Sequence, residues 1–323
     1  MKIFNFIAML TFISSLAVIT TESFFNPQQV KPSLWETYRR SLRVAKYVDL
    51  THEIATDMSV WSGFGHPNCS PSVDPKTNRR YTYEIDGFEA NEYQLPTDQL
   101  GTQLDPPAHW NPDYPSIDEL PATFCIRPLV VISIVDQVKA NPGYSLTVDD
   151  VLNWENIHGK IPAESVVFIR SDWSKEWGQE GLTERTVFPG VSLKALQFLH
   201  LERGILLHGH EPLDTDATPD LESERWLLTN GYTQAEGVTN LDQVPETGAL
   251  LAIGFAKLKG GLGGYARFIA ICPPDWKHGV TITETPDSPL MKQPTPLRWD
   301  PAAGFRSRLP RNQPPAQAID THN

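Results

Sequence analysis

Apolar residues form nearly continuous runs in the middle of the chain. Residues 129–135 read Leu-Val-Val-Ile-Ser-Ile-Val, and residues 166–170 read Val-Val-Phe-Ile-Arg. Runs of this kind, rich in β-branched residues, are typical of strands that are buried on both faces. Residues 81–95 instead alternate between polar and apolar positions, which predicts a half-buried strand pair. Further strands are expected at residues 47–54, 205–207, 250–255 and 267–272.

Helix signals lie between these runs. Residues 33–45 predict one helix, with arginines in its second half. Thr147 is a suitable N-cap for a second helix that reaches Trp154. A third helix is expected from Ser192, its N-cap, to Leu201, with Gly204 beyond its end. Because helices and strands interleave, we predict an α/β fold with a mixed β-sheet and flanking helices.

Composition and charge narrow the classes of protein. A chain of 323 residues with 40% hydrophobic residues can bury a substantial core in one large domain or two small ones. The formal net charge is −12, and no block of Lys or Arg offsets it. Nucleic acid and anionic membrane surfaces are therefore not expected as partners.

The two ends of the chain differ from its body. An apolar run follows Lys2 and continues to about Thr20, which predicts a signal peptide over residues 1–23 and a secreted protein without stable membrane insertion. The alternative is an uncleaved signal anchor, since the run approaches spanning length. We expect an N-terminal extension at residues 24–45, the hydrolase-like body at residues 46–283 and a Pro-rich tail at residues 284–323. The tail is expected to be disordered or to lie against the surface.

The chain contains three cysteines, Cys69, Cys125 and Cys272, and no C-x-x-C pair. This pattern excludes a disulfide scaffold and a thiolate zinc site. One bridge could form in an oxidising compartment, but the spacing does not say between which two residues. The tripeptide Asn68-Cys69-Ser70 fits the rule for an N-glycosylation acceptor.

Residues 99–109, Gln-Leu-Gly-Thr-Gln-Leu-Asp-Pro-Pro-Ala-His, concentrate candidate chemistry in a short span. A turn locked by Gly101 and the two prolines would hold the polar side chains in a fixed relation. An aspartate in such a turn suits a hard cation, although an Asx-turn or a cap is the common structural alternative. The polar side chains concerned are Gln99, Gln103, Asp105 and His109.

This segment resembles the H-x-G-T-H-x-D-x-P-x-H signature of the cyclase-type metal-dependent hydrolases, the family of bacterial kynurenine formamidase and isatin hydrolase. Gln99 and Gln103 stand at the two histidine positions of the signature. Further blocks match the family in order along roughly residues 46–275. The resemblance implies the family's mixed sheet with flanking helices, usually as a homodimer. The matching blocks are residues 48–52 with 58–61, 168–173, 188–192, 202–205, and 261–264 with 267–271.

The resemblance also implies a set of site residues. Asp105 would be a metal ligand and His109 the proton shuttle. Glu236 takes a second ligand position, and Glu224 stands where the family has a histidine. Together with Gln99 and Gln103 these form an oxygen-only set, which favours Mn²⁺ or Mg²⁺ over Zn²⁺, with a metal-free site as the alternative.

Each of these assignments has a structural alternative. Glu224 is equally consistent with a solvated helix residue, and the two glutamines with hydrogen bonds to each other or to substrate. Without a metal, three carboxylates converge only if one of them is protonated or if Arg225 intervenes.

Aromatic residues and histidines complete the predicted pocket. Trp61, Phe64 and Trp110 are candidate walls for a flat aromatic substrate, although core packing is the commoner role of such residues. In His208-Gly-His-Glu, the two histidines share one face of a strand, and we expect His210 to line the pocket. A second, independent zinc site there is the less favoured interpretation.

The function implied by the resemblance is hydrolysis of an amide, lactam, formamide or lactone bond of a small molecule, as by the arylformamidase of tryptophan catabolism. Metal-activated water would attack the carbonyl, and His109 would transfer the proton. Because three ligand histidines are replaced, the alternative is a catalytically impaired pseudoenzyme or a small-molecule-binding protein of the same fold.

Overall fold

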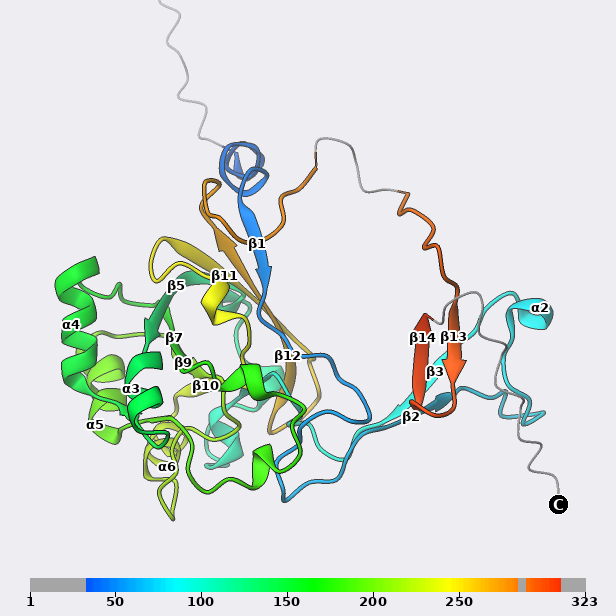
Figure 1. Ribbon diagram of the computed structural model, residues 1–323, viewed down its shortest axis with the longest axis horizontal. Helices are drawn as coiled ribbons and strands as arrows, with labels where there is room; N and C mark the ends of the chain where they lie inside the picture. The colour runs from blue at the N-terminus through cyan, green and yellow to red at the C-terminus, as the bar shows by residue number, and fades with distance from the viewer. Residues whose placement is uncertain (1–32, 284–288, 309–323) are drawn as a thin grey trace, which may run out of the picture.

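The computed structural model describes residues 33–283 and 289–308. Its centre is an eight-stranded mixed sheet in the order β1-β12-β11-β5-β7-β9-β10-β4 (Figure 1). β4 also pairs with β12, so the strands from β12 to β4 close into a seven-stranded barrel, and β1 is added along β12. The strands are β1 (Lys46–Asp49), β4 (Gln103–Asp105), β5 (Ile126–Ser133), β7 (Val166–Arg170), β9 (Leu207–His210), β10 (Thr233–Glu236), β11 (Ala249–Phe255) and β12 (Gly264–Cys272). The predicted α/β fold with a mixed sheet is confirmed.

Four of these strands, β5, β7, β9 and β10, run parallel to one another. The connections between them pass through helices that lie together on one side of the sheet in Figure 1. This arrangement follows from chain geometry, because parallel neighbours need a crossover and a helix usually supplies it. The crossover helices are α3 (Val135–Ala140), α4 (Val148–His158), α5 (Leu193–Gln197) with the π-helical turn Phe198–Glu202, and α6 (Glu222–Thr229). A short parallel pair, β6 (Ser145–Leu146) and β8 (Gly190–Val191), joins two of these connections.

β5 and β7 are buried on both faces over their apolar runs, as these runs predict. In β5, Leu129 and Val131 point into the barrel core, whereas Val130 and Ile132 pack in a second core with the helices. Phe168 and Phe268 meet edge to face inside the barrel with ring centroids 5.7 Å apart. The barrel wall is therefore packed on both sides.

The predicted N-caps Thr147 and Ser192 are confirmed. Thr147 and Asp150 form a capping box at α4, and the Ser192 hydroxyl accepts the Ala195 N–H at α5. Residues 33–45 contain α1 (Leu34–Thr37) and the π-helical segment Tyr38–Leu42, with Ser33 as N-cap. The strand expected at residues 129–135 ends two residues earlier, because Val135 starts α3. The strand expected at residues 205–207 runs on to His210.

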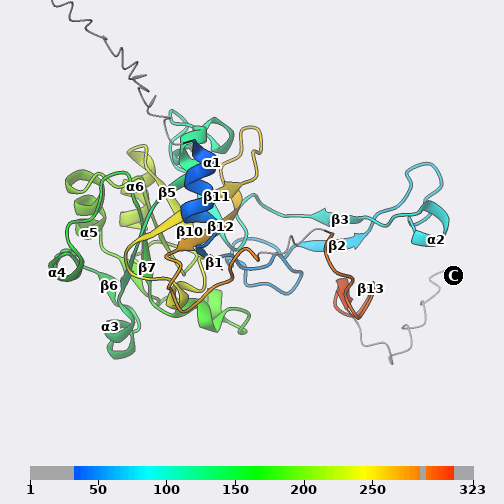
Figure 2. The same cartoon turned by 90° about the horizontal axis from the view of Figure 1, so that it is seen from above.

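An arm projects from the body, and the expectation for residues 81–95 was wrong there. The arm contains β2 (Asn68–Pro71) paired with β3 (Asn91–Gln94), and α2 (Tyr83–Asp86) near its far end (Figure 2). Residues 81–95 are thus a short helix followed by one strand, not a strand pair. The Thr82 hydroxyl caps α2, and Gly87, at φ 77°, ends it in the left-handed region that glycine adopts without strain.

Part of the Pro-rich tail is ordered against this arm. A hairpin of β13 (Leu297–Asp300) and β14 (Phe305–Arg308) lies beside it, which fits the surface-bound alternative. The Arg306 guanidinium donates from Nε to Asn91 Oδ1 at 2.8 Å and forms an ion pair with Glu89. The rest of the tail, residues 284–288 and 309–323, lies outside the described residues, as does the predicted signal peptide.

Cys69, Cys125 and Cys272 are unpaired in the structure, and Asn68 of the glycosylation tripeptide is exposed on β2. Within residues 33–283 and 289–308, no helix is long and apolar enough to cross a membrane.

Candidate active site

The site is built on three neighbouring strands. Each strand contributes three residues, in which two polar residues flank a small or apolar one. β9 supplies His208 and His210, β10 supplies Gln234 and Glu236, and β4 supplies Gln103 and Asp105. Because side chains alternate along a strand, all six lie on the helix-facing side of the barrel wall. The intervening residues Gly209, Ala235 and Leu104 face the barrel interior. A Cβ at Gly209 would lie 2.6 Å from the Phe168 ring, so no larger residue fits there.

Two glutamine amides join the two innermost carboxyl groups. Gln103 Nε2 donates to Glu236 Oε2 at 2.9 Å and to Asp105 Oδ1 at 3.3 Å. Gln234 Nε2 donates to Glu236 Oε1 at 2.8 Å and to Asp105 Oδ2 at 3.1 Å. The Gln234 amide is held in this orientation because its oxygen accepts the Thr215 hydroxyl at 2.6 Å. Each oxygen of Asp105 and Glu236 therefore already accepts an amide hydrogen bond.

Two further acids approach from the β9–α6 connection. Glu224 lies in the first turn of α6 and is 4% exposed, so it is not a solvated helix residue. Its Oε2 accepts the Thr215 N–H at 3.3 Å. Asp214, which the sequence analysis did not single out, precedes Thr215 in the same loop. Arg225 does not intervene among these acids, because its guanidinium binds the Asp220 carbonyl and lies over the Trp110 ring.

A cavity of about 190 Å³ opens above these groups. The predicted walls Trp61, Phe64 and Trp110 line it, together with Leu213 and Leu221. Its polar lining consists of Gln99, Gln103, His109, Asp214, Glu224 and Glu236. The structure thus brings most of the predicted residues to one aromatic-walled space. Asp105 lies beneath the cavity, behind the two glutamine amides.

His109 ends the 3-10 helix Pro107–His109 and is oriented by Gln99. Gln99 Nε2 lies 2.9 Å from His109 Nδ1 and donates to the Leu262 carbonyl at 3.1 Å. Since the carbonyl can only accept, the amide nitrogen faces the ring, and Nδ1 accepts its second hydrogen. The neutral ring then carries its proton on Nε2. Burial lowers the pKa of His109, against a partial opposing effect of Asp98, so the neutral form is favoured.

Crowding of acids in a buried space raises their pKa values. Burial, and then the charges of Asp105 and Asp214, raise the pKa of Glu224 to about 8. Burial, and then Asp105 and Asp216, raise the pKa of Asp214 to about 7. Burial also raises the pKa of both Asp105 and Glu236. Protonation, one of the two solutions expected for converging carboxylates, is the one that the structure supports.

The expected metal set does not fit a divalent cation in this arrangement. Amide N–H groups, which cannot ligate a cation, occupy the space between Asp105 and Glu236. Gln99 binds His109 and does not turn toward the acids. Among the described residues no three His, Cys, Asp or Glu side chains form a group that could hold a metal ion. The metal that the resemblance implies and its identity, Mn²⁺ or Mg²⁺, stay a prediction, and we derive no chemistry from a metal.

The histidines of β9 lie beneath the floor of the cavity, the layer formed by the acids and glutamine amides described above. His210 is 2% exposed and does not line the cavity, contrary to expectation; its Nδ1 contacts the Pro212 carbonyl at 3.0 Å and its Nε2 the Thr215 hydroxyl at 2.9 Å. His208 lies beside it, with ring centroids 5.6 Å apart. Burial lowers the pKa of His210 to about 4, and lowers that of His208 further below its usual range. Both ring nitrogens of His210 already contact hydrogen-bond partners, so the geometry does not support an independent zinc site on this pair.

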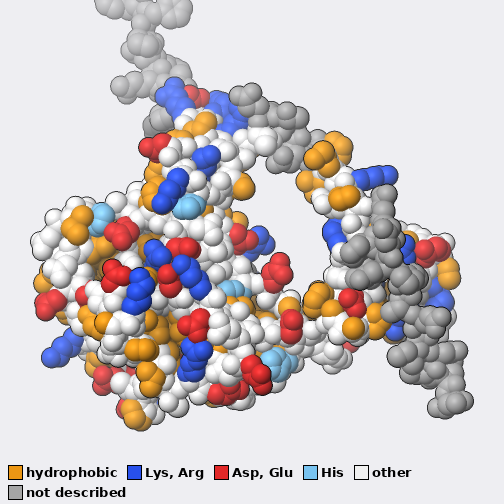
Figure 3. Space-filling view, viewed as in Figure 1, with side chains coloured by type: hydrophobic (Ala, Val, Ile, Leu, Met, Phe, Trp, Pro, Cys, Tyr) orange, Lys and Arg blue, Asp and Glu red, His pale blue; other side chains and the backbone are white. Residues whose placement is uncertain are grey.

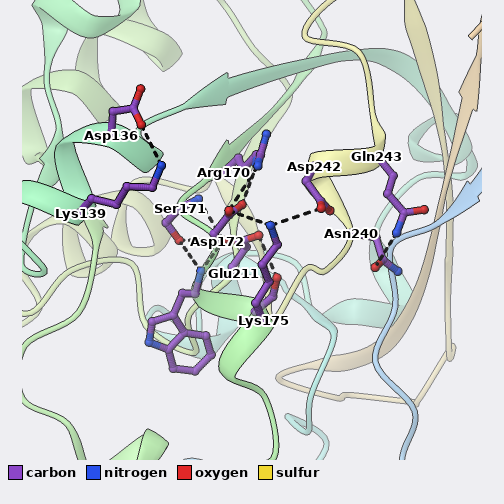
Figure 4. Close-up of polar contacts among 12 residues, drawn as sticks. Asp136, Lys139, Arg170, Ser171, Asp172, Lys175, Glu211, Asn240, Asp242 and Gln243 are labelled. Carbon is purple, nitrogen blue, oxygen red and sulfur yellow. Dashed lines mark hydrogen bonds and ion pairs between the residues drawn. The ribbon is translucent and has the colours of Figure 1, made fainter. Parts of the chain in front are cut away.

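Glu211, the last residue of the His-Gly-His-Glu stretch, has a structural role (Figure 4). Its Oε2 accepts the Ser171 hydroxyl at 2.7 Å and the backbone N–H groups of Ser171 and Trp173 at 2.9 Å. Its Oε1 accepts the Ser174 hydroxyl at 2.9 Å. Glu211 therefore fixes the end of β7 against the end of β9, close to the loop that carries Asp214.

Sequence reasoning missed three site residues, and each had a different signal. Gln234 lies two residues before Glu236, and this alternation on one strand could have placed it on the same face. Thr215 and Asp214 lie in an irregular loop without periodicity. No sequence pattern would have shown that this loop folds over the floor.

Comparison with known proteins shows the family. Residues 48–217 match the family described as "Putative cyclase". The chain is 30% identical over 207 residues to the isatin hydrolase of Roseibium aggregatum, an alignment that covers 59% of this chain and 78% of that protein. This protein belongs to the cyclase family of hydrolases.

Solved structures agree with this placement. Isatin hydrolase A from Labrenzia aggregata, bound to benzyl benzoate, superposes with a TM-score of 0.67 at 28% identity, over 75% of this chain and 100% of that chain. A protein described as a potential metal-dependent hydrolase with cyclase activity superposes with a TM-score of 0.53 at 19% identity, over 70% of this chain and 97% of that chain. At that identity the second likeness shows a shared fold.

The buried acids predict a pH dependence of stability. Because the pKa values of Glu224 and Asp214 are raised to about 8 and 7, their stabilising contribution is complete below pH 4 and is lost as the pH rises toward 8. The lowered pKa of His210, about 4, has the opposite effect on stability, because the protein loses stability as the pH falls below 6.5. Above pH 6.5, the two acids therefore determine how stability changes with pH.

We therefore expect the unfolding free energy of chelator-treated protein to fall by roughly 1–2 kcal/mol per acid between pH 6.5 and 8. Urea titrations at both pH values measure this fall. Glu224→Gln should reduce it, whereas Asp220→Asn, an exposed change in the same connection, should not. Stability that is flat or rising over this interval contradicts the assignment of protonated acids to the floor.

Proposed function

We propose that this protein hydrolyses an amide bond of a small aromatic substrate in the cavity, with a pair of carboxyl groups in place of the metal. The observation that supports this most is that Asp214 and Glu224 face one aromatic-walled cavity with pKa values near neutrality. The isatin hydrolases, whose named substrate is a cyclic amide, make an amide the favoured bond among those that the resemblance implies.

The roles follow from the protonation states. At neutral pH Asp214, with the lower pKa, is the group that is partly ionised and can take a proton from water. Glu224, with the higher pKa, is neutral and can give a proton to the leaving nitrogen. His109 would donate a hydrogen bond from Nε2 to the substrate carbonyl oxygen, since Gln99 already occupies Nδ1. His109 is then a hydrogen-bond donor, a narrower role than the proton shuttle that the resemblance implied.

A screen of aromatic amides, formamides, lactams and esters tests this proposal. We expect turnover of at least one aromatic amide or lactam by purified protein, with the same rate before and after chelation. No hydrolysis in the panel, or activity that chelation abolishes and Mn²⁺, Mg²⁺ or Zn²⁺ restores, would contradict it.

A binding protein of the same fold is the second candidate function. The favouring observation is that the amides of Gln103 and Gln234 donate to every oxygen of Asp105 and Glu236, where the resemblance implies metal ligands. Aromatic amides would then raise the melting temperature without being hydrolysed. Steady release of product in the same samples excludes this candidate.

Two further proposals concern the whole protein. We infer secretion from the pattern of residues 1–23, supported by the exposed Asn68 tripeptide. Mass spectrometry of the protein from culture medium should show a cleaved N-terminus.

We also infer a homodimer. A two-stranded ribbon is only marginally stable by itself. The arm also exposes apolar side chains (Figure 3), among them Tyr83, Ile85, Phe88 and Tyr93. Sedimentation should give twice the monomer mass, and Ile85→Lys should reduce it.

A further inference from the structure

A second cavity, of about 420 Å³, opens at the opposite end of the parallel strands from the catalytic cavity. It is lined by residues that lead into three of these strands, residue 164 before β7, residues 204–206 before β9 and residues 231–233 at the start of β10. Thr233 and Glu236 begin and end β10, about 10 Å apart along the strand. Among the described residues, the two cavities share no lining residue. The second cavity is therefore a separate site.

Most of the wall of the second cavity is apolar. Leu120, Phe124 and Leu206 line it and also pack against the barrel core. Three prolines, Ile205 and Tyr232 add to the apolar lining. The volume lies within the range of roughly 300–1,000 Å³ that is common for small-molecule sites. With rings at positions 124 and 232 in the wall, the cavity suits a ligand that carries a planar ring.

Two polar side chains enter this apolar space from the barrel side of their strands. Arg127 lies two residues before Leu129 on β5, and Thr233 lies two residues before Ala235 on β10. Because side chains alternate along a strand, Arg127 and Thr233 share the faces of Leu129 and Ala235, which belong to the barrel core. Both polar residues also line the second cavity. They therefore lie where the apolar barrel interior meets the cavity.

Both polar side chains have a buried atom without a partner. The Thr233 hydroxyl oxygen and Arg127 Nε form no hydrogen bond with any part of the chain that the structure describes. Thr233 as a whole is 4% exposed. Buried polar groups are normally hydrogen-bonded, so a ligand group with acceptor oxygens would complete both of these side chains.

The charge of the second cavity favours an anion for this role. Among the described residues that line it, the charged ones are Arg127 and Glu164. Arg127 Nη1 donates to Glu164 Oε2 at 3.3 Å, and the two side chains are 18% and 78% exposed. An ion pair with so exposed a partner contributes little free energy. A carboxylate held inside the cavity would bind the guanidinium with less screening by water, and its oxygens can accept from both unpartnered groups.

We propose that the second cavity binds a small aromatic carboxylate, with its ring against the apolar wall and its carboxylate on Arg127 and Thr233. A neutral amide of the same size gains nothing from the guanidinium charge, and an ammonium ion is repelled by it. The inference goes beyond the proposed hydrolysis and does not depend on it, because it concerns a separate cavity.

Equilibrium binding tests this inference without turnover. Benzoate and benzamide share a ring and a shape and differ in charge, whereas acetate has the charge and lacks the ring. By calorimetry at pH 7.5, we expect benzoate to bind at least tenfold more tightly than either benzamide or acetate. Benzoate that binds no better than benzamide would overturn the proposal.

Variants assign the binding to the second cavity. Arg127→Leu should weaken benzoate binding at least tenfold, and Thr233→Val, which keeps the shape of the side chain, should weaken it several-fold. Glu164→Gln should strengthen it, because the change removes a competing carboxylate from Arg127. Arg298→Leu, which removes an exposed arginine on β13, is the matched control and should leave the affinity unchanged.

The catalytic cavity is the other place where benzoate could bind. Trp61→Ala changes the wall of that cavity and should leave benzoate affinity within about twofold of the parent. Binding that is lost in Trp61→Ala but kept in Arg127→Leu and Thr233→Val lies in the catalytic cavity and overturns the proposal. If Arg127→Leu does not fold, the opposite shifts expected for Thr233→Val and Glu164→Gln still decide.

Discussion

Glu224→Gln is expected to lower kcat for the best amide substrate by at least about 100-fold, because general acid catalysis commonly contributes 10²–10⁴. Glutamine keeps the shape of the side chain and its place in the first turn of α6, but it has no acidic proton for the leaving nitrogen. Asp214→Asn should have an effect of similar size, since the amide cannot take a proton from water. KM should change less than kcat in both variants.

The pH profile distinguishes catalysis from structural damage. Wild-type kcat/KM should follow a narrow bell, with apparent pKa values near 7 and 8 that belong to the Asp214–Glu224 pair. Each variant should lose one limb of the bell. Asp220→Asn is the control, with an unchanged profile. Retention of activity within a few fold in Glu224→Gln would remove Glu224 from the chemistry.

The second large effect concerns the two glutamines of the family motif. Replacing both, Gln99→His with Gln103→His, is expected to raise zinc affinity at least about 100-fold, because each imidazole supplies a nitrogen ligand in place of a weak amide donor. Position 103 lies on β4 with Asp105 and Glu236 within reach of its side chain. Position 99 lines the same cavity.

Isothermal titration with zinc measures the gain. The matched control, Gln99→Leu with Gln103→Leu, removes the same amides without adding nitrogen ligands and should bind zinc no better than the parent. An unchanged isotherm in a folded double-histidine variant would show that Asp105 and Glu236 are not placed to share a cation with positions 99 and 103.

Several parts of the fold were predictable because the causes are local. β5 and β7 are apolar on both faces, which follows from their central place in the mixed sheet, and the α4 and α5 caps depend on residues within one turn. The arm was not predictable. Its residues 81–95 alternate as a strand does, but pairing with β2 and the Thr82 and Gly87 caps decide the outcome.

In the candidate site, too, features fixed by local sequence were predictable and features fixed by distant partners were not. Asp105 and His109 were predicted because the motif fixes their spacing, and Glu224 and Glu236 because the resemblance located their positions. The direction of each glutamine amide was not predictable, since it depends on partners far along the chain, Thr215 for Gln234 and Leu262 for Gln99. Those contacts turn the amide N–H groups of Gln234 toward Asp105 and Glu236 and that of Gln99 toward His109.

The central claim is that an amide is hydrolysed by protonatable acids in this cavity. The most direct measurement is the rate of hydrolysis of an aromatic amide by protein whose metal content has been determined by elemental analysis, before and after removal of all divalent metal. We predict equal rates at substoichiometric metal in both samples. A stoichiometric metal whose removal abolishes hydrolysis and whose return restores it would contradict this account.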